Sequence, residues 1–284
     1  MGYNMNGDRL DGFCDLHIHS TSSDGALGVG EILEVARRKG LKAISITDHD
    51  SIDSQEELVL LAKKLGMEVA SGIEFSVDND NSNIHVLGYF IDFRNTDLLN
   101  ATEELRTYRM ERAEKILEKL RSKGFDISIN DVISGDEDIP IGRPHIAMAM
   151  YRMGFVSSYS EAFDMYLSNG ASCYVPKKVF NLDKVMELIK SAGGVPVWAH
   201  PGWSAFDSEL LNRFLALGIR GIEVWHPNHT PELESNLLEL AMEKGLVATG
   251  GSDFHSYEAE RVEIGTKGTP YRNFLRLKEI AGIF

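Results

Sequence analysis

The sequence lacks any apolar run long enough to span a membrane, and its 284 residues include only two cysteines, Cys14 and Cys173. Because a membrane-spanning helix needs about 20 consecutive apolar residues, no membrane partner is expected. The first eleven residues have neither the basic start nor the apolar core of a signal peptide. The cysteines show no Cys-x-x-Cys spacing and are too few for an all-thiolate metal site. These absences favour a reducing, cytoplasmic setting.

An excess of positive charge is also missing. The chain has 29 Lys and Arg residues against 43 Asp and Glu residues, which gives a net charge of −14. Such an acidic surface repels polyanions at long range, which argues against extended DNA binding. A small anionic substrate is still compatible with this charge if divalent metal ions reverse the local field. Nothing in the composition indicates the oligomeric state.

Short apolar segments alternate with helical patterns toward both ends of the chain. The expected strands are residues 13–19, 43–46, 68–73, 84–91, 195–199, 221–225 and 246–250. This alternation implies an α/β fold with a mostly parallel sheet. Seven strands suggest a barrel related to the eight-stranded TIM type, with one strand fewer. An open doubly wound sheet is the structural alternative, although the sequence has no Gly-rich dinucleotide loop to favour it.

The alternation stops in the middle of the chain, where residues 95–175 show only helical patterns. A long helix is expected over residues 102–123, closed by Gly124. Pro144 begins another helix, and Ser158 and Glu161 have the spacing of a capping box. We therefore expect a barrel domain formed by residues 1–94 and 176–284, and a helical insertion of residues 95–175 that caps the active site.

Charged and metal-binding side chains gather at the ends of the expected strands. They lie at or just after the C-terminal end of six of the seven strands: His17, His19, Asp48, His49, Glu74, His200, Glu223, His226, Asp253 and His255. In a parallel barrel these ends form one face, on which catalysis occurs. His85 is the exception, because it stands near the start of its strand and reaches this face only if that strand forms a hairpin. Packing has no use for such side chains there, so the pattern predicts a metal centre.

The supply of ligands exceeds what one metal ion can bind. Mixed histidine and carboxylate ligands suit Mn, Fe or Zn. Carboxylates can bridge two ions, and paired ions about 3.5–4 Å apart suit phosphoryl transfer. The sequence therefore predicts more than one divalent ion.

Five short motifs together resemble those of the PHP (polymerase and histidinol phosphatase) family. They are His17-x-His19 with Asp24, Thr47-Asp48-His49, Gly72-Ile73-Glu74, Ala199-His200-Pro201 and Gly251-Ser252-Asp253-Phe254-His255. The layout, including Gly142-Arg143-Pro144-His145 and Glu223-Val224-Trp225-His226-Pro227, is similar to the stand-alone metal-dependent phosphoesterases of that family, such as nucleoside 3′,5′-bisphosphate phosphatases. The resemblance implies a distorted seven-stranded (β/α)7 TIM-like barrel with a trinuclear metal centre.

The resemblance also implies a role for each matching residue. His17, His19, Glu74 and Asp253 would hold the first metal ion, Glu74, His85 and His200 the second, and Asp24, His49 and His255 the third. Glu74 would bridge, and the three divalent ions would be Mn, Fe or Zn. The substrate phosphate would contact Arg143, His145 and His226, and either histidine would protonate the leaving oxygen. A water between two cations would supply the attacking hydroxide.

Several of these residues also have a plain structural interpretation. Glu223 fits a carboxylate that orients a histidine ligand, and Asp48 fits the same role or a structural one. His229 is better explained as the approach to a helix cap than as a ligand. Three residues can be ordinary surface or loop residues: Arg143, His145 and His226.

These expectations converge on a metal-dependent phosphoric ester hydrolase with a small phosphorylated substrate, a nucleotide or a sugar phosphate. A nucleoside 3′,5′-bisphosphate is the first expectation, giving an AMP-type product and phosphate, with short 5′-phosphorylated RNA as a further substrate. Two enzymatic alternatives stay open, a phosphoribosyl 1,2-cyclic phosphate phosphodiesterase/phosphatase and a histidinol-phosphate phosphatase. An alternative of another class is a catalytically silent metal-binding scaffold, against which the full set of ligands argues.

Overall fold

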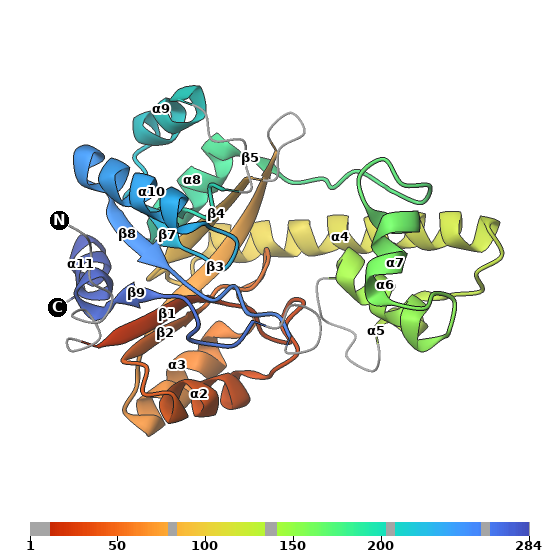
Figure 1. Cartoon of the computed structure of the whole chain (residues 1–284), viewed down its shortest axis with the longest axis horizontal. Coiled ribbons are helices and arrows are strands. Elements are labelled where there is room, and N and C mark those ends of the chain that lie inside the picture. Colours follow the sequence, from red (N-terminus) through yellow and green to blue (C-terminus); the bar gives the residue numbers. More distant parts are fainter. Residues whose placement is uncertain (1–11, 79–83, 134–140, 203–207, 257–261, 284) are drawn as a thin grey trace. The chain divides into compact units, whose positions relative to one another are not determined.

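The computed structural model describes residues 12–78, 84–133, 141–202, 208–256 and 262–283 (Figure 1). The first eleven residues, expected to lack a signal peptide, lie outside the described residues. The chain forms two compact units, one of Met1–Asn100 with Phe180–Phe284 and the other of Ala101–Val179. Within the described ranges, no helix combines the length and the apolar character needed to cross a membrane.

A nine-stranded sheet forms the centre of the first unit, with the order β8-β7-β6-β4-β3-β2-β1-β9 and with β5 paired to β3. The strands are β1 (Phe13–Ile18), β2 (Ala43–Ile46), β3 (Glu68–Asp78), β4 (Ile84–Tyr89), β5 (Phe180–Asn181), β6 (Val195–Trp198), β7 (Gly221–Trp225), β8 (Val247–Gly250) and β9 (Thr269–Pro270). Strand β2 pairs in parallel with β1 and β3, and β7 pairs in parallel with β6 and β8. Strand β4 is antiparallel to both β3 and β6, so it joins two parallel halves.

The sheet nearly closes into a barrel where β1 meets the segment that follows β8. The backbone N–H of His19 donates to Phe254 O at 3.0 Å, and that of Asp253 donates to His17 O at 2.8 Å. Ile18 and Phe254 also form a parallel bridge. The predicted TIM-like barrel of seven main strands is thus confirmed, with the two-residue strands β5 and β9 added to it. The open doubly wound alternative is not adopted.

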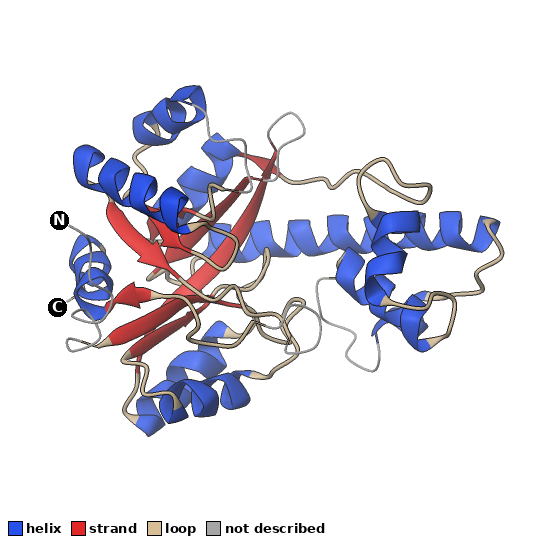
Figure 2. Cartoon of the chain, in the orientation of Figure 1, coloured by secondary structure: helices blue, strands red, loops and turns tan. Residues whose placement is uncertain are grey.

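Helices lie around the sheet (Figure 2). Each of them has buried apolar residues. They are α2 (Val29–Arg38), α3 (Gln55–Leu65), α8 (Leu182–Ser191), α9 (Ser208–Ala216), α10 (Pro231–Lys244) and α11 (Tyr271–Ile280). In α2 the stripe consists mainly of Ile32, Leu33 and Ala36, at the spacing of one helix face. Helix α10 is capped at its start, because Thr230 Oγ1 accepts a hydrogen bond from Leu233 N.

The second unit is helical and has a hydrophobic core of its own. It contains most of α4 (Thr96–Ser122), with α5 (Ile129–Ile133), α6 (Arg143–Arg152), α7 (Tyr159–Ala162) and the π-helix η1 (Phe163–Leu167). Ile116, Leu117 and Leu120 of α4 are buried in one cluster with Ile146 and Met150 of α6. Helix α4 starts earlier than the expected residue 102. That this unit caps the active site stays a prediction.

Candidate metal centre

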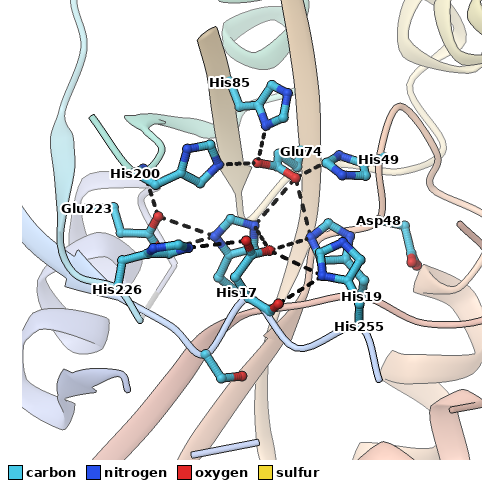
Figure 3. Close-up of polar contacts among 12 residues, drawn as sticks. His17, His19, Asp48, His49, Glu74, His85, His200, Glu223, His226 and His255 are labelled. Atoms are coloured by element: carbon cyan, nitrogen blue, oxygen red, sulfur yellow. Dashed lines mark hydrogen bonds and ion pairs between the residues drawn. The ribbon is translucent and has the colours of Figure 1, made fainter. Parts of the chain in front are cut away.

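The nine expected metal ligands all belong to the first unit, and most of them are seen together in Figure 3. They are His17, His19, Asp24, His49, Glu74, His85, His200, Asp253 and His255. The ring centroids are 4.1 Å apart for His19 and His255, 4.4 Å for His19 and His49, and 5.1 Å for His85 and His200. The strand ends bring these side chains to one face of the barrel. Active sites of such barrels lie on that face.

His85 joins this group because β3 and β4 form an antiparallel hairpin. Ser76 of β3 pairs with His85, and Glu74 pairs with Leu87. Since β4 runs in the reverse direction, its first residues lie beside the C-terminal end of β3. His85 Nδ1 consequently lies 2.8 Å from Glu74 Oε1. The hairpin on which the position of His85 depended is therefore present.

Glu74 lies at the centre of the group and is fully buried. Its Oε1 is 2.8 Å from His85 Nδ1 and 2.9 Å from His200 Nε2. Its Oε2 is 2.7 Å from His49 Nδ1, and 3.4 Å from Nε2 of both His17 and His19. Both oxygens of one carboxylate thus face several imidazole nitrogens, which is the arrangement of a residue able to bridge two ions.

Three sets of side chains have donor atoms that all lie within 4.8 Å of one another. The sets are His17, His19, Glu74 and Asp253; His49, Glu74 and His85; and His19, Asp24, His49 and His255. The first has the same members as the first expected grouping. The second holds His49 where His200 was expected, although His200 also contacts Glu74, and the third adds His19 to the expected residues.

The donor atoms in these sets fit metal ions. Several buried atoms of these sets make no hydrogen bond to any described residue, among them His17 Nε2, His19 Nδ1, His49 Nδ1 and Glu74 Oε2. His49 Nδ1 and Glu74 Oε2 are close enough for a hydrogen bond but do not have its alignment. Buried polar atoms without a partner are costly, and imidazole and carboxylate donors suit divalent transition metals. The cluster is therefore able to bind metal ions.

The electrostatics of the cluster favour the protonation states that metal binding requires, except at His17 and His200, whose pKa values are raised. Burial alone would raise the pKa of Glu74 and Asp253, but the neighbouring histidines hold both well below the usual carboxyl range. Burial lowers the pKa of His19 to about 3 and that of His85 to about 4. For His17 burial also acts downward, but the surrounding carboxylates, Asp253 foremost, raise its pKa well above the ordinary value. Ionised carboxylates and neutral imidazoles are the forms that ligate metals.

Glu223 supports two of the candidate ligands with one carboxylate. Its Oε1 lies 3.1 Å from His17 Nδ1, and its Oε2 accepts the backbone N–H of His200 at 2.8 Å. His200 has a φ of 24°, a conformation that non-glycine residues rarely adopt. Glu223 thus orients one imidazole and holds a strained backbone, which agrees with the interpretation that it positions a ligand.

Asp48 holds the loop after β1 instead of facing the donor sets. It accepts hydrogen bonds from the hydroxyls of Ser20, Ser23 and Ser54 at 2.6–2.7 Å. Ser54 stands at the N-cap position of α3, but its side chain makes no cap hydrogen bond because it donates to Asp48. These contacts agree with the structural interpretation of Asp48.

The two histidines after β7 are buried and support neighbouring groups. His226 Nδ1 accepts the backbone N–H of Asn228 at 3.2 Å, so its proton lies on Nε2, which donates to Asp253 Oδ2 at 3.1 Å. His229 Nδ1–H donates to Val224 O at 2.8 Å, and its Nε2 accepts Gly202 N at 3.2 Å. His229 thus fixes the loop after His200, as expected of a residue that is not a ligand.

Two buried carboxylates that were not singled out in the sequence fix the backbone around the site. Asp15 accepts the backbone N–H of Ser252 at 2.9 Å and ties β1 to the segment after β8. Asp50, with a φ of 54°, accepts Ser76 N at 2.8 Å and ties the end of β2 to β3. A carboxylate in an otherwise apolar strand was an available signal for Asp15. The role of Asp50 depends on a left-handed backbone, which no sequence pattern shows.

Arg143 and His145 belong to the helical unit, where each is held by local contacts. Arg143 Nη1 donates to Leu167 O at 3.1 Å, and His145 Nδ1 accepts the backbone N–H of Gly142 at 3.0 Å. The backbone N–H of Gly142 is therefore used by His145. That Arg143, His145 and His226 contact a substrate phosphate stays a prediction.

The chain is similar in sequence and in structure to several known proteins. Residues 15–173, more than half of the chain, match the PHP domain. A 3′,5′-nucleoside bisphosphate phosphatase of Chromobacterium violaceum is 31% identical over 247 residues, which cover 85% of this chain and 87% of that protein. A 5′-3′ exoribonuclease of Haemophilus influenzae is 30% identical over 255 residues, or 88% of this chain and 92% of that protein. The solved structure of a candidate metal-dependent phosphoesterase of Bifidobacterium adolescentis has a TM-score of 0.87 and 30% identity, covering 94% of this chain and 96% of that one.

Proposed function

Since the chain belongs to the PHP domain family, we propose that it is a metal-dependent phosphoesterase that hydrolyses phosphate monoesters of small nucleotides. The observation that carries this proposal is the position of Glu74. This buried carboxylate belongs to two of the three donor sets and faces imidazoles with both oxygens. A bridging carboxylate between adjacent divalent ions is an arrangement that suits phosphoryl transfer.

We propose that three divalent ions, Mn, Fe or Zn, occupy the three donor sets. Glu74 would be shared between the first two, and His200 would complete the second. Ions bound there would supply positive charge to the phosphoryl oxygens and lower the pKa of the attacking water. No covalent nucleophile of the protein is needed for such a reaction.

The chain's own residues orient this site and move protons around it. His226 donates its Nε2 proton to Asp253 and so fixes the direction of that carboxylate. Because this proton is committed to Asp253, His145 is the stronger candidate for protonating the leaving oxygen. The contact between Gly142 N–H and His145 Nδ1 keeps the His145 proton on Nε2. Arg143 would contact the substrate phosphate with its guanidinium group.

The substrate class follows from the two relatives of known activity. One is named for nucleoside 3′,5′-bisphosphates, and the other for degrading RNA from its 5′ end. We therefore propose a nucleoside 3′,5′-bisphosphate as the substrate and an AMP-type nucleotide with inorganic phosphate as the products. Short 5′-phosphorylated RNA is the next candidate.

The test is phosphate release by the Mn-loaded protein and by the same protein after chelation. The substrates are adenosine 3′,5′-bisphosphate, a short 5′-phosphorylated RNA, a phosphoribosyl cyclic phosphate and histidinol phosphate. We expect metal-dependent release, fastest from the bisphosphate. Faster turnover of another member would replace the proposed substrate. A protein that binds metal but hydrolyses none of the four would contradict the enzymatic proposal and favour the scaffold.

A further inference from the structure

Asp24 is a candidate ligand whose position depends on a loop. It lies in the loop of residues 20–28 between β1 and α2, and its Oδ1 is 3.4 Å from His255 Nε2. Its side chain belongs to the third donor set, which consists of His19, Asp24, His49 and His255. Three of these four residues are half-buried, whereas the whole first set is buried. The third set therefore depends on how this loop is anchored.

One anchor of the loop is the fully buried carboxylate of Asp48. Its Oδ1 accepts the backbone N–H of Ser20 at 2.8 Å and the hydroxyl of Ser23 at 2.6 Å, and its Oδ2 accepts the hydroxyl of Ser20 at 2.7 Å. The hydroxyl of Ser54, at the start of α3, donates to Oδ2 at 2.6 Å. Four such bonds fill the acceptor positions of a carboxylate. Three of them come from the loop, and Ser23 directly precedes Asp24.

The same loop is joined to the segment that carries His255. The backbone N–H of Ala26 donates to His255 O at 2.7 Å. The loop also packs tightly against the end of β1, because a Cβ atom on Gly25 would lie only 2.2 Å from His19 O. The loop therefore connects Asp24 with a second member of the third set, and a displacement of the loop would move both of them.

Asp48 also supports the candidate bridging residue Glu74, but through its backbone. Asp48 O accepts the backbone N–H of Glu74 at 3.1 Å. The hydrogen bonds of its side chain instead go to the loop and to the start of α3. Neither the first nor the second donor set contains a residue of the loop. A change in the side chain of Asp48, or in its partners in the loop, should therefore affect the third set selectively.

We propose that Asp48 is a positioning residue for the third donor set. Through Ser20 and Ser23, its carboxylate fixes the loop that presents Asp24 and thereby determines the affinity of the third set for its ion. A charged acceptor suits this task, because hydrogen bonds to a carboxylate are shorter and stronger than those between neutral groups. This role rests on the proposed function, since it concerns one of the three proposed ions. It also explains why a buried carboxylate directly before His49 belongs to none of the donor sets.

The experiment compares two variants that each remove one hydroxyl group from the Asp48 carboxylate. Ser23 and Ser54 are both 2% exposed, and each hydroxyl lies 2.6 Å from an oxygen of Asp48. Only Ser23 belongs to the loop, so Ser54→Ala is the matched control for Ser23→Ala. The full chain and both variants are equilibrated with a series of free Mn concentrations, and bound Mn per protein is measured by mass spectrometry.

We expect Ser23→Ala to require about 10- to 100-fold more free Mn to bind its third equivalent, which is the range for residues that orient a ligand. The first two equivalents should be unchanged, and Ser54→Ala should follow the wild-type curve. Asp48→Asn removes the charge but keeps the backbone contact with Glu74, and it should show the same selective loss. Equal circular dichroism of the metal-free proteins excludes misfolding as the cause. If Ser23→Ala does not fold, Ser20→Ala takes its place.

Wild-type binding of all three equivalents by both Ser23→Ala and Asp48→Asn would overturn this role of Asp48. An equal loss in Ser23→Ala and Ser54→Ala would also overturn it, because the effect would then not pass through the loop. A wild-type protein that binds fewer than three ions would contradict the three-ion centre, and this role with it. If the wild type binds three ions but hydrolyses no substrate, the proposed function fails, and the Mn titration alone decides the role of Asp48.

Discussion

Nδ1 of His85 lies 2.8 Å from Oε1 of Glu74, across the β3–β4 hairpin. The reversal of one strand therefore brings a histidine to the face on which the parallel strands end. On the other side of the same carboxylate, Oε2 lies 2.7 Å from His49 Nδ1, at the end of β2. With His200 after β6 and His17 in β1 also close to it, Glu74 connects side chains from four strands or their following loops, and its replacement should affect more than one ion.

Replacement of Glu74 by glutamine is expected to remove more than one equivalent of bound metal and to abolish phosphate release. Glutamine keeps the size of the side chain but removes the charge and one metal-binding oxygen. The measurement is metal content by mass spectrometry together with phosphate release. Glu263→Gln is the matched control, because Glu263 is exposed and contacts Lys39 at the surface. Wild-type metal content in Glu74→Gln would disprove the bridging role.

Replacement of Glu223 by glutamine is expected to weaken metal binding about 10- to 100-fold without removing a ligand. That range is typical when a residue that orients a ligand is lost. Glu223 contacts the His17 ring and the backbone N–H of His200, so the variant loosens two ligands at once. Competition with a chelator of known affinity measures the change. Excess metal should restore most activity, whereas an unrecoverable loss would indicate that Glu223 has another role.

Much of this site could be predicted from the sequence because its ligands lie at strand ends. The alternation of His17 and His19, and the position of Asp253 directly after a buried strand, needed only the two-residue period of a strand and the parallel order of a barrel. These are local patterns. They lead to a common face without knowledge of any long-range contact.

The remaining features depend on long-range geometry. The direction of β4, and with it the position of His85, is set by pairing with β3 and β6 and not by any local motif. Asp50 acts through a left-handed backbone. Pairing, convergence and backbone conformation are properties of the folded chain and leave no periodic signal.

Metal binding should release at least one proton per protein near neutral pH, because the pKa of His17 lies well above its ordinary value and that of His200 is raised as well. The metal-free imidazole is then protonated and must lose its proton to become a ligand. The apparent affinity should therefore fall as the pH is lowered, by at most about tenfold per pH unit for one proton. His19 and His85, with pKa values of about 3 and 4, are already neutral and add nothing in this range.

Calorimetric titration of Mn in buffers of different ionisation enthalpy measures this proton. The observed heat should vary with the buffer for the wild type. It should vary less for Glu223→Gln, because the loss of that carboxylate removes one of the charges that raise the pKa of His17. Heats that are independent of the buffer would show that His17 binds metal without losing a proton, or that it is not a ligand.

Removal of the metal ions is expected to lower the unfolding temperature. Ions that bind only the folded chain stabilise it by about 2.7 kcal/mol when their free concentration is 100 times Kd. For a chain of 284 residues, that corresponds to a shift of roughly 4–5 °C for each occupied site. The ions also neutralise ionised carboxylates that are buried, such as Glu74, so their effect is specific to this cluster.

Scanning calorimetry with a chelator and then with increasing Mn measures the shift. Asp253→Asn should lose most of the Mn-dependent rise while Glu263→Gln keeps it; an equal rise in both variants would mean that Mn stabilises the protein elsewhere.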